Sequence, residues 1–89
     1  MLEFERVIWP AQLRAARALL GLSQAELAKR AGLGHATVRR IEQSEGEIRG
    51  TARTVQKLQV TLEELGIIFI AKDDEHGYGV RLRKMVGHD

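Results

Sequence analysis

The sequence predicts a mainly α fold, in which four helices are followed by a C-terminal β-hairpin. Between residues 10 and 65, apolar residues recur at the three- and four-residue spacing of helices. Glycines at positions 21, 32 and 66 interrupt this pattern where helices would end. Two short apolar runs, residues 67–71 and 80–84, then flank a polar loop that contains glycines, which is typical of a hairpin.

The first helix is expected to begin at Pro10 and to stop at Gly21. Proline suits the first helical position because its missing N–H would have no partner there, and glycine tolerates the backbone conformation that ends a helix. The residues facing inward would be Leu13, Ala16 and Leu20. Before this helix, residues 2–9 alternate loosely between apolar and polar and predict a short strand.

The second helix has a clear start and a clear end. Ser23 is placed to cap it, and Glu26, three residues later, completes a capping box. Gly32 ends it in a position that tolerates positive φ. The inward residues would be Leu27, Ala28 and Ala31.

The third and fourth helices are separated by a polar segment, residues 44–50. The third is expected over residues 35–43, after Leu33 has closed the turn, and the fourth from Thr51 or Ala52 to Leu65. The residues on their apolar stripes are Val38, Ile41, Val55, Leu58, Leu62 and Leu65.

Composition and length favour a small intracellular protein. The 89 residues predict one domain, with a helical bundle over residues 10–65 and a hairpin over residues 66–85. The absence of cysteine excludes disulfides and thiolate metal sites and fits a reducing cytosol. The N-terminus lacks a signal-peptide pattern, and no apolar run approaches the roughly 20 residues that span a bilayer. We therefore expect a soluble, cytoplasmic protein.

Basic charge gathers on the helical part of the chain. Between residues 11 and 57 there are nine basic and four acidic residues, whereas the rest of the chain carries five basic and eight acidic residues. Ten of the fourteen basic residues are arginine, which favours phosphate and base contacts over a simply solvated surface. The charge pattern predicts contact with nucleic acid, and double-stranded DNA is the expected partner.

The segment SQAELAKRAGLGHATVRRIEQ, residues 23–43, combines two short helices with a tight glycine turn. Its small and apolar residues fall where the helix-turn-helix of the lambda-repressor and Cro superfamily has them, and it resembles the XRE-type regulators of that superfamily. The resemblance covers roughly residues 12–65. It implies a sequence-specific transcriptional regulator, most simply a repressor. The chain shows no nucleophile–base pair, paired carboxylates or phosphate-binding glycine loop, so we expect neither enzymatic activity nor a cofactor.

Base contacts are expected from the third helix. A helical wheel with Val38 and Ile41 buried leaves Ala36, Arg40 and Gln43 on the opposite side, flanked by Arg39. Arginine pairs bidentately with guanine, which makes Arg40 the strongest candidate. The residues onto which the resemblance maps base contacts are His35, Ala36, Thr37 and Arg40.

Contacts with the DNA backbone are expected around the same helices. The resemblance places Gln24, at the start of the second helix, on the DNA backbone. Supporting contacts with the backbone are expected from Arg39, Gln43, Arg49 and Arg53. One position departs from the family pattern: Gly34 stands where family members usually have a serine or threonine cap, so it offers no hydroxyl to a phosphate.

The resemblance also implies a structural ion pair. In this family an arginine of the first helix pairs with a glutamate that closes the third, and Arg17 and Glu42 occupy those positions. We expect the pair to fix the angle of the third helix.

The apolar residues of the predicted hairpin indicate how the protein assembles. A lone two-stranded hairpin is marginal in water, so its apolar residues require a further surface, supplied by residues 2–9 or by a second protomer. We expect a homodimer built on the fourth helix and the hairpin, bound to a pseudo-palindromic operator. The alternative is an antitoxin that regulates its own operon and binds a toxin protein. The acidic loop with His76 matches no metal-binding spacing, so no metal site is expected.

Overall fold

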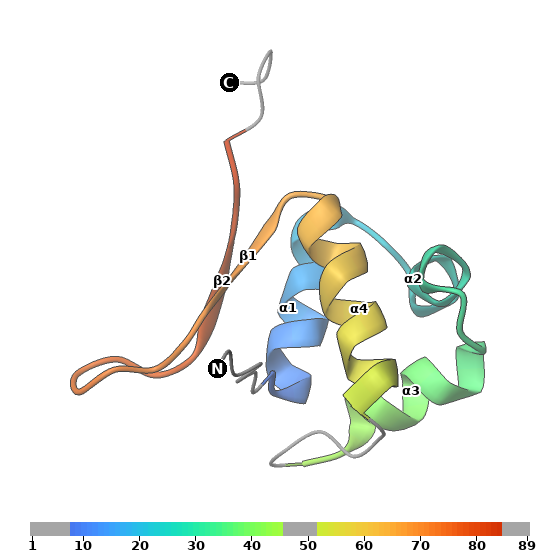
Figure 1. Ribbon diagram of the computed structural model, residues 1–89, viewed down its shortest axis with the longest axis horizontal. Helices are drawn as coiled ribbons and strands as arrows, with labels where there is room; N and C mark the ends of the chain where they lie inside the picture. Colours follow the sequence, from blue (N-terminus) through green and yellow to red (C-terminus); the bar gives the residue numbers. More distant parts are fainter. Residues whose placement is uncertain (1–7, 46–51, 85–89) are drawn as a thin grey trace.

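The structure, a computed structural model, describes residues 8–45 and 52–84. Four helices form a bundle and an antiparallel hairpin lies against one side of it (Figure 1). The elements are α1 (Pro10–Leu20), α2 (Gln24–Ala31), α3 (His35–Gln43), α4 (Ala52–Glu64), β1 (Ile67–Ile70) and β2 (Gly79–Leu82). The predicted mainly α fold with a C-terminal hairpin is confirmed.

The helices α1 and α2 end at glycines in the left-handed conformation. Gly21 has φ 70° and Gly32 has φ 72°, a region that side chains with a Cβ atom rarely adopt. At the start of α2, the Ser23 hydroxyl accepts a hydrogen bond from the Glu26 N–H (3.0 Å), and the Glu26 carboxylate accepts one from the Ser23 N–H (2.8 Å). These bonds complete the predicted capping box and lower the pKa of Glu26.

Some predicted boundaries differ from those in the structure. Both strands end earlier than predicted, β1 at Ile70 and β2 at Leu82, and β2 begins one residue earlier, at Gly79. Beyond β2, Arg83 still donates a backbone hydrogen bond to the Gly66 carbonyl (2.7 Å). Of the strand predicted over residues 2–9 only the last two residues are described, and they lie in neither helix nor strand. Thr51 and most of the predicted 44–50 loop lie outside the described residues.

The core lies between the four helices and the inner face of the hairpin. Leu13 and Ala16 of α1 line it together with the predicted inward residues of α2 and α3, and α4 contributes Leu58 and Leu62, which are fully buried. Leu20, Leu33 and Val55 are only partly buried and pack around the edge of this cluster. Ile8 and Ile67 close the core from outside the helices, with exposed fractions of 3% and 2%.

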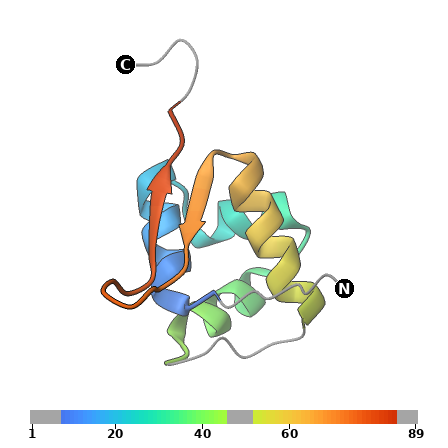
Figure 2. The same ribbon diagram turned by 60° about the vertical axis from the view of Figure 1, so that its left-hand side comes forward.

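The hairpin covers α1 through β2 and touches α4 through β1 (Figure 2). Its antiparallel register pairs Ile67 with Leu82 and Phe69 with Val80, so these four side chains share one face. Because Ile67 is buried while Phe69 and Val80 pack against the core, this is the inner face. Ile68 and Ile70 lie on the outer face and are exposed.

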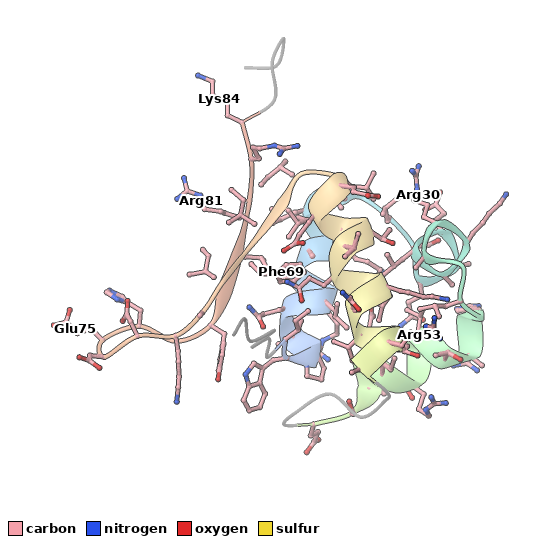
Figure 3. The ribbon with its side chains drawn as sticks, viewed as in Figure 1. Arg30, Arg53, Phe69, Glu75, Arg81 and Lys84 are labelled. Carbon is pink, nitrogen blue, oxygen red and sulfur yellow. The ribbon has the colours of Figure 1, made fainter. Side chains whose placement is uncertain are left out.

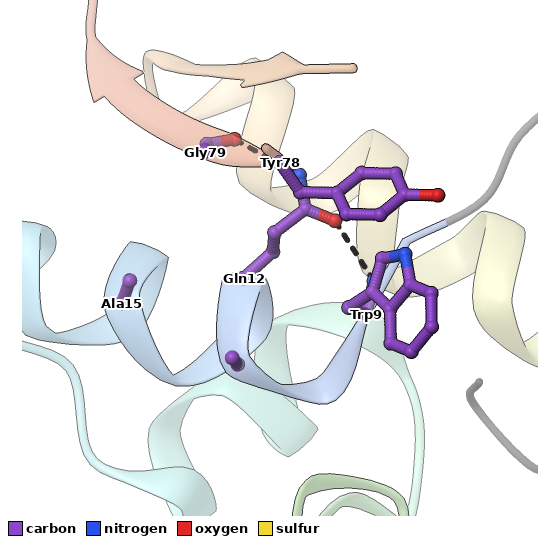
Figure 4. Close-up of a pocket in the computed structure, with 6 residues that line it drawn as sticks. Trp9, Gln12, Ala15, Tyr78 and Gly79 are labelled. Atoms are coloured by element: carbon purple, nitrogen blue, oxygen red, sulfur yellow. Dashed lines mark hydrogen bonds between the residues drawn. The ribbon is translucent and has the colours of Figure 1, made fainter. Parts of the chain in front are cut away.

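Gln12 joins the hairpin to α1. Its side chain is 5% exposed, and its amide nitrogen donates to the carbonyl oxygens of Gly79 (2.9 Å) and Ile70 (3.3 Å). Its amide oxygen accepts the backbone N–H of Trp9 (2.8 Å) at the start of the helix (Figure 4). The Trp9 and Tyr78 rings, 5.1 Å apart, cover the same junction.

Replacing Gln12 with leucine is expected to lower the free energy of unfolding by about 1–3 kcal/mol, because the Trp9 N–H and the two strand carbonyls lose a buried partner. Hydrogen exchange of the β2 amides should accelerate more than that of α3. The matched control is Gln56→Leu, at an exposed position of α4. Unchanged β2 exchange in the Gln12 variant would contradict the anchoring role.

Candidate nucleic-acid interface

The helix α3 turns one polar side toward solvent. Val38, Ile41 and Glu42 are its buried residues. The candidate base-contacting residues His35, Ala36 and Arg40 are exposed, whereas Thr37 is half-buried. The structure thus places three of the four predicted base contacts on one accessible surface at the start and middle of the helix.

Gly34 caps α3 without a side-chain hydrogen bond. Its φ of −76° and ψ of 149° are open to any residue, and a Cβ atom built there would meet only the Thr37 hydroxyl, at 3.8 Å. Neither backbone conformation nor space therefore requires glycine at this position. The cap of α3 therefore offers backbone N–H groups but no side-chain hydroxyl to an anion.

The carboxylate of Glu42 is buried beneath α3, with 1% of the side chain exposed. Arg17 of α1 donates to both of its oxygens, from Nε at 2.8 Å and from Nη2 at 2.9 Å. Gln24 of α2 donates its amide nitrogen to Oε1 at 3.0 Å. The predicted ion pair is therefore present, and it belongs to a network that joins three helices.

Two further hydrogen bonds extend this network. Arg17 Nη1 donates to the Leu22 carbonyl (2.9 Å), in the segment between α1 and α2, and Arg14 Nη1 donates to the Glu42 carbonyl at the end of α3. The hydrogen bonds to Glu42 raise the pKa of Arg17, outweighing the opposing effect of burial. Such a satisfied buried carboxylate fixes the orientation of α3 relative to α1 and α2.

The candidate residues for contact with the DNA backbone differ in how exposed their side chains are, and one of them lies outside the described residues. Arg39, Gln43 and Arg53 are exposed, and Arg53 lies beside Ala31 at the end of α2, on the side of the bundle away from the hairpin (Figure 3). Within residues 8–45 and 52–84, the side chains of Arg39, Arg40 and Arg53 form no ion pair or hydrogen bond. Gln24 is half-buried with its amide nitrogen engaged, and Arg49 lies outside the described residues.

The acidic loop of the hairpin is organised by its own hydrogen bonds. Asp73 accepts the backbone N–H groups of Glu75 (2.8 Å) and His76 (2.7 Å), and its carboxylate also contacts the His76 ring. These hydrogen bonds lower the pKa of Asp73, and the one from the backbone N–H of Glu75 has the largest effect. All of the charged side chains in this loop are exposed.

The family model of helix-turn-helix domains matches residues 13–63 of this sequence. The chain belongs to this family. It is of the lambda-repressor and Cro-like XRE type, as the resemblance implied, and is a DNA-binding transcriptional regulator. A search of the curated proteins found no match. No helix among the described residues is long and apolar enough to cross a membrane.

The helix-turn-helix match covers α2, α3, α1 from Leu13 onward and α4 up to Glu63, but not the hairpin. Sequence reasoning missed two residues that bind these parts together. Arg14 lies one turn before Arg17 on α1, and this spacing was the available signal that both reach α3. Gln12 occupies the position where a capping-box glutamine stands, but no local pattern indicates its bonds to the hairpin.

Proposed function

We propose that this helix-turn-helix protein is a repressor that binds a pseudo-palindromic operator as a homodimer, with α3 in the major groove. The observation that carries the proposal is the exposed side of α3. Its arginines have no partner among the described residues, while the buried Glu42 network holds the helix in place. In such a dimer the two α3 helices would lie about 34 Å apart, one turn of DNA.

Within this proposal, Arg40 pairs bidentately with a guanine, and the role is supported by its exposed guanidinium, which has no partner among residues 8–45 and 52–84. His35 and Ala36 contact bases near the start of α3, where the methyl group of Ala36 suits a thymine methyl. Thr37 is the weakest of the four candidates because it is half-buried. It would contact DNA through the exposed part of its side chain.

The DNA backbone would be held around these base contacts. Arg39, Gln43 and Arg53 supply side-chain donors, and Arg49 is proposed to join them. Gln24 is engaged with Glu42, so we propose that it contacts a phosphate through its remaining amide hydrogen or the free N–H at the start of α2.

Selection of bound sequences from a random DNA library tests the function. Wild-type protein should enrich a two-fold-related site. Arg40→Ala should lose preference at one position of each half-site by roughly 5- to 150-fold, corresponding to 1–3 kcal/mol. Arg53→Ala is the matched arginine control: it should weaken binding to all sequences alike, because a phosphate contact carries no base information. An Arg40 variant that enriches the wild-type site unchanged would refute its role, and enrichment of no site by wild-type protein would refute the function.

The antitoxin alternative shares the DNA-binding surface and differs in requiring a toxin. The exposed apolar residues of the hairpin, Ile68, Ile70 and Leu82, are the observation that keeps it open. A protein that remains bound through purification and is inhibited by this chain would favour it over the simple repressor.

A further inference from the structure

We propose that the free edge of β2 is where a second copy of this chain docks. The β2 strands of the two copies would pair antiparallel about a two-fold axis, which joins the hairpins into one four-stranded sheet. The inference rests on the proposed dimer and specifies its surface, its strand direction and its register. That surface consists of the hairpin and α1, in place of the fourth helix and the hairpin that the sequence led us to expect.

The backbone of β2 has hydrogen-bonding groups along this edge that bond to no other described residue. In an antiparallel ladder, residues that bond to the neighbouring strand alternate with residues whose N–H and C=O point away. Arg83 bonds to Gly66, so with the observed register Arg81 also faces β1, whereas Val80 and Leu82 direct their backbone groups outward. An open row of this kind is a template for another strand.

The edge of β2 is more accessible than the edge of β1. Residues of β1 contact α4, and Ile67 is buried there. No residue of β2 is buried, and Leu82 is 41% exposed. Figure 2 shows β1 between β2 and α4, so among the described residues no further strand lies along the far side of β2, where α1 passes behind it.

The surface of α1 beside this edge is apolar. Ala11, Ala15 and Ala18 are exposed along it, and Leu19 is 47% exposed. An open hollow of about 430 Å³ lies between Ala11 and Ala15 of α1 and Gly79 at the start of β2, and Trp9, Gln12 and Tyr78 also line it (Figure 4). A second copy alongside β2 would cover this surface as well as the strand edge.

Charge determines which partner fits. The loop before β2 carries Asp73, Asp74 and Glu75, while the far end of β2 carries Arg81, Arg83 and Lys84 (Figure 3). In an antiparallel pair each acidic loop approaches the basic end of the other copy, whereas a parallel pair would bring like charges together. The strand is therefore complementary to itself, as a two-fold interface requires.

The same charges restrict the register. A two-fold axis beside Arg81 would place the Arg81 side chains of the two copies directly opposite each other, and like charges in that position destabilise a strand pair. An axis beside Val80 places Arg81 opposite Gly79 of the second copy and lets the outward backbone groups of the two Val80 residues bond to each other. This register also brings Lys84 to the acidic loop of the second copy. The hairpin and the first turn of α3 lie on opposite sides of the bundle (Figure 1), so the proposed DNA surface stays free.

Variants with reversed charges test the direction in which the two strands pair. Their oligomeric state is measured by sedimentation in the absence of DNA. Wild-type protein should be a dimer. Asp74→Lys/Glu75→Lys and Arg83→Glu/Lys84→Glu should each weaken the dimer about tenfold or more, because like charges then meet. When mixed, the two variants should form a heterodimer, since each loop again faces an opposite charge. The control, Glu45→Lys/Glu64→Lys, makes the same charge change at exposed acids outside the hairpin and should stay dimeric.

A second pair of variants tests the strand edge itself. Leu82→Pro removes the outward N–H without breaking a bond to β1, whereas Leu82→Ala removes the same side chain and keeps the N–H. The proline variant should be monomeric and the alanine variant largely dimeric. Equal behaviour of these two, a monomeric wild type, or failure of the charge variants to form a heterodimer would overturn the inference. The library selection of bound DNA is a separate measurement, so enrichment of a half-site by a monomer would leave the DNA-binding part of the proposed function intact.

Discussion

Replacing Glu42 with alanine is expected to lower the free energy of unfolding by about 3–5 kcal/mol, because it leaves the partly buried Arg17 guanidinium without its counter-charge. Arg17 loses two hydrogen bonds to the carboxylate and Gln24 loses one. A domain of this size has a total stability of about 4–13 kcal/mol, so a large share of the folded protein would be lost at physiological temperature.

Urea unfolding followed by circular dichroism measures the Glu42 effect. Glu42→Gln keeps an acceptor oxygen without the charge and should fall between wild type and alanine. Glu45→Ala, three residues later and exposed, should stay within about 0.5 kcal/mol of wild type. The double variant Arg17→Met/Glu42→Leu should recover much of the lost free energy of unfolding, since it leaves no partly buried charge without a counter-charge. A Glu42→Ala protein within 1 kcal/mol of wild type would show that the carboxylate does not hold the three helices together.

Replacing Leu62 with alanine is expected to cost about 2–5 kcal/mol, because it opens a cavity in a core where this side chain is fully buried. Val60, on the same helix, is 42% exposed, and Val60→Ala should cost far less. The midpoint of urea unfolding should fall for Leu62→Ala with an unchanged slope. Equal midpoints for the two variants would place Leu62 outside the core.

The two substitutions should differ in their effect on DNA. Folded Leu62→Ala protein should enrich the same sequences as wild type, since Leu62 lies in α4 and away from the Glu42 network. Folded Glu42→Gln protein should bind those sequences more weakly, because the orientation of α3 is no longer fixed by the carboxylate. This contrast separates a loss of stability from a loss of positioning.

The helices were predictable because their signals are local. The Ser23–Glu26 capping box, the glycines at 21 and 32 and the apolar stripes each act within a few residues, and the structure places helix ends at them. The strands were located less well because a short strand ends where its pairing ends, and pairing depends on a distant segment. Ile70 and Leu82, the last strand residues, carry no stop signal.

The candidate site was predictable in its outline, and the roles of its residues in DNA binding stay predictions. The wheel around Val38 and Ile41 correctly separated the buried and exposed sides of α3. The engagement of Gln24 by Glu42 and the bonds from Gln12 to the hairpin were not foreseen. Each joins residues at least 18 positions apart, and such bonds depend on how the elements pack, which local spacing does not encode.

The carboxylate that ties α1, α2 and α3 together has a consequence for the operator. In the complex proposed above, α3 is tied through Glu42 to both α1 and α2, so it would not tilt on its own to follow an imperfect groove and the double helix would have to deform to meet it. Base steps that bend or twist easily are then favoured between the half-sites, at positions that no side chain touches. We expect the operator to carry a preference for flexible pyrimidine–purine steps near its centre, in addition to the bases contacted by α3.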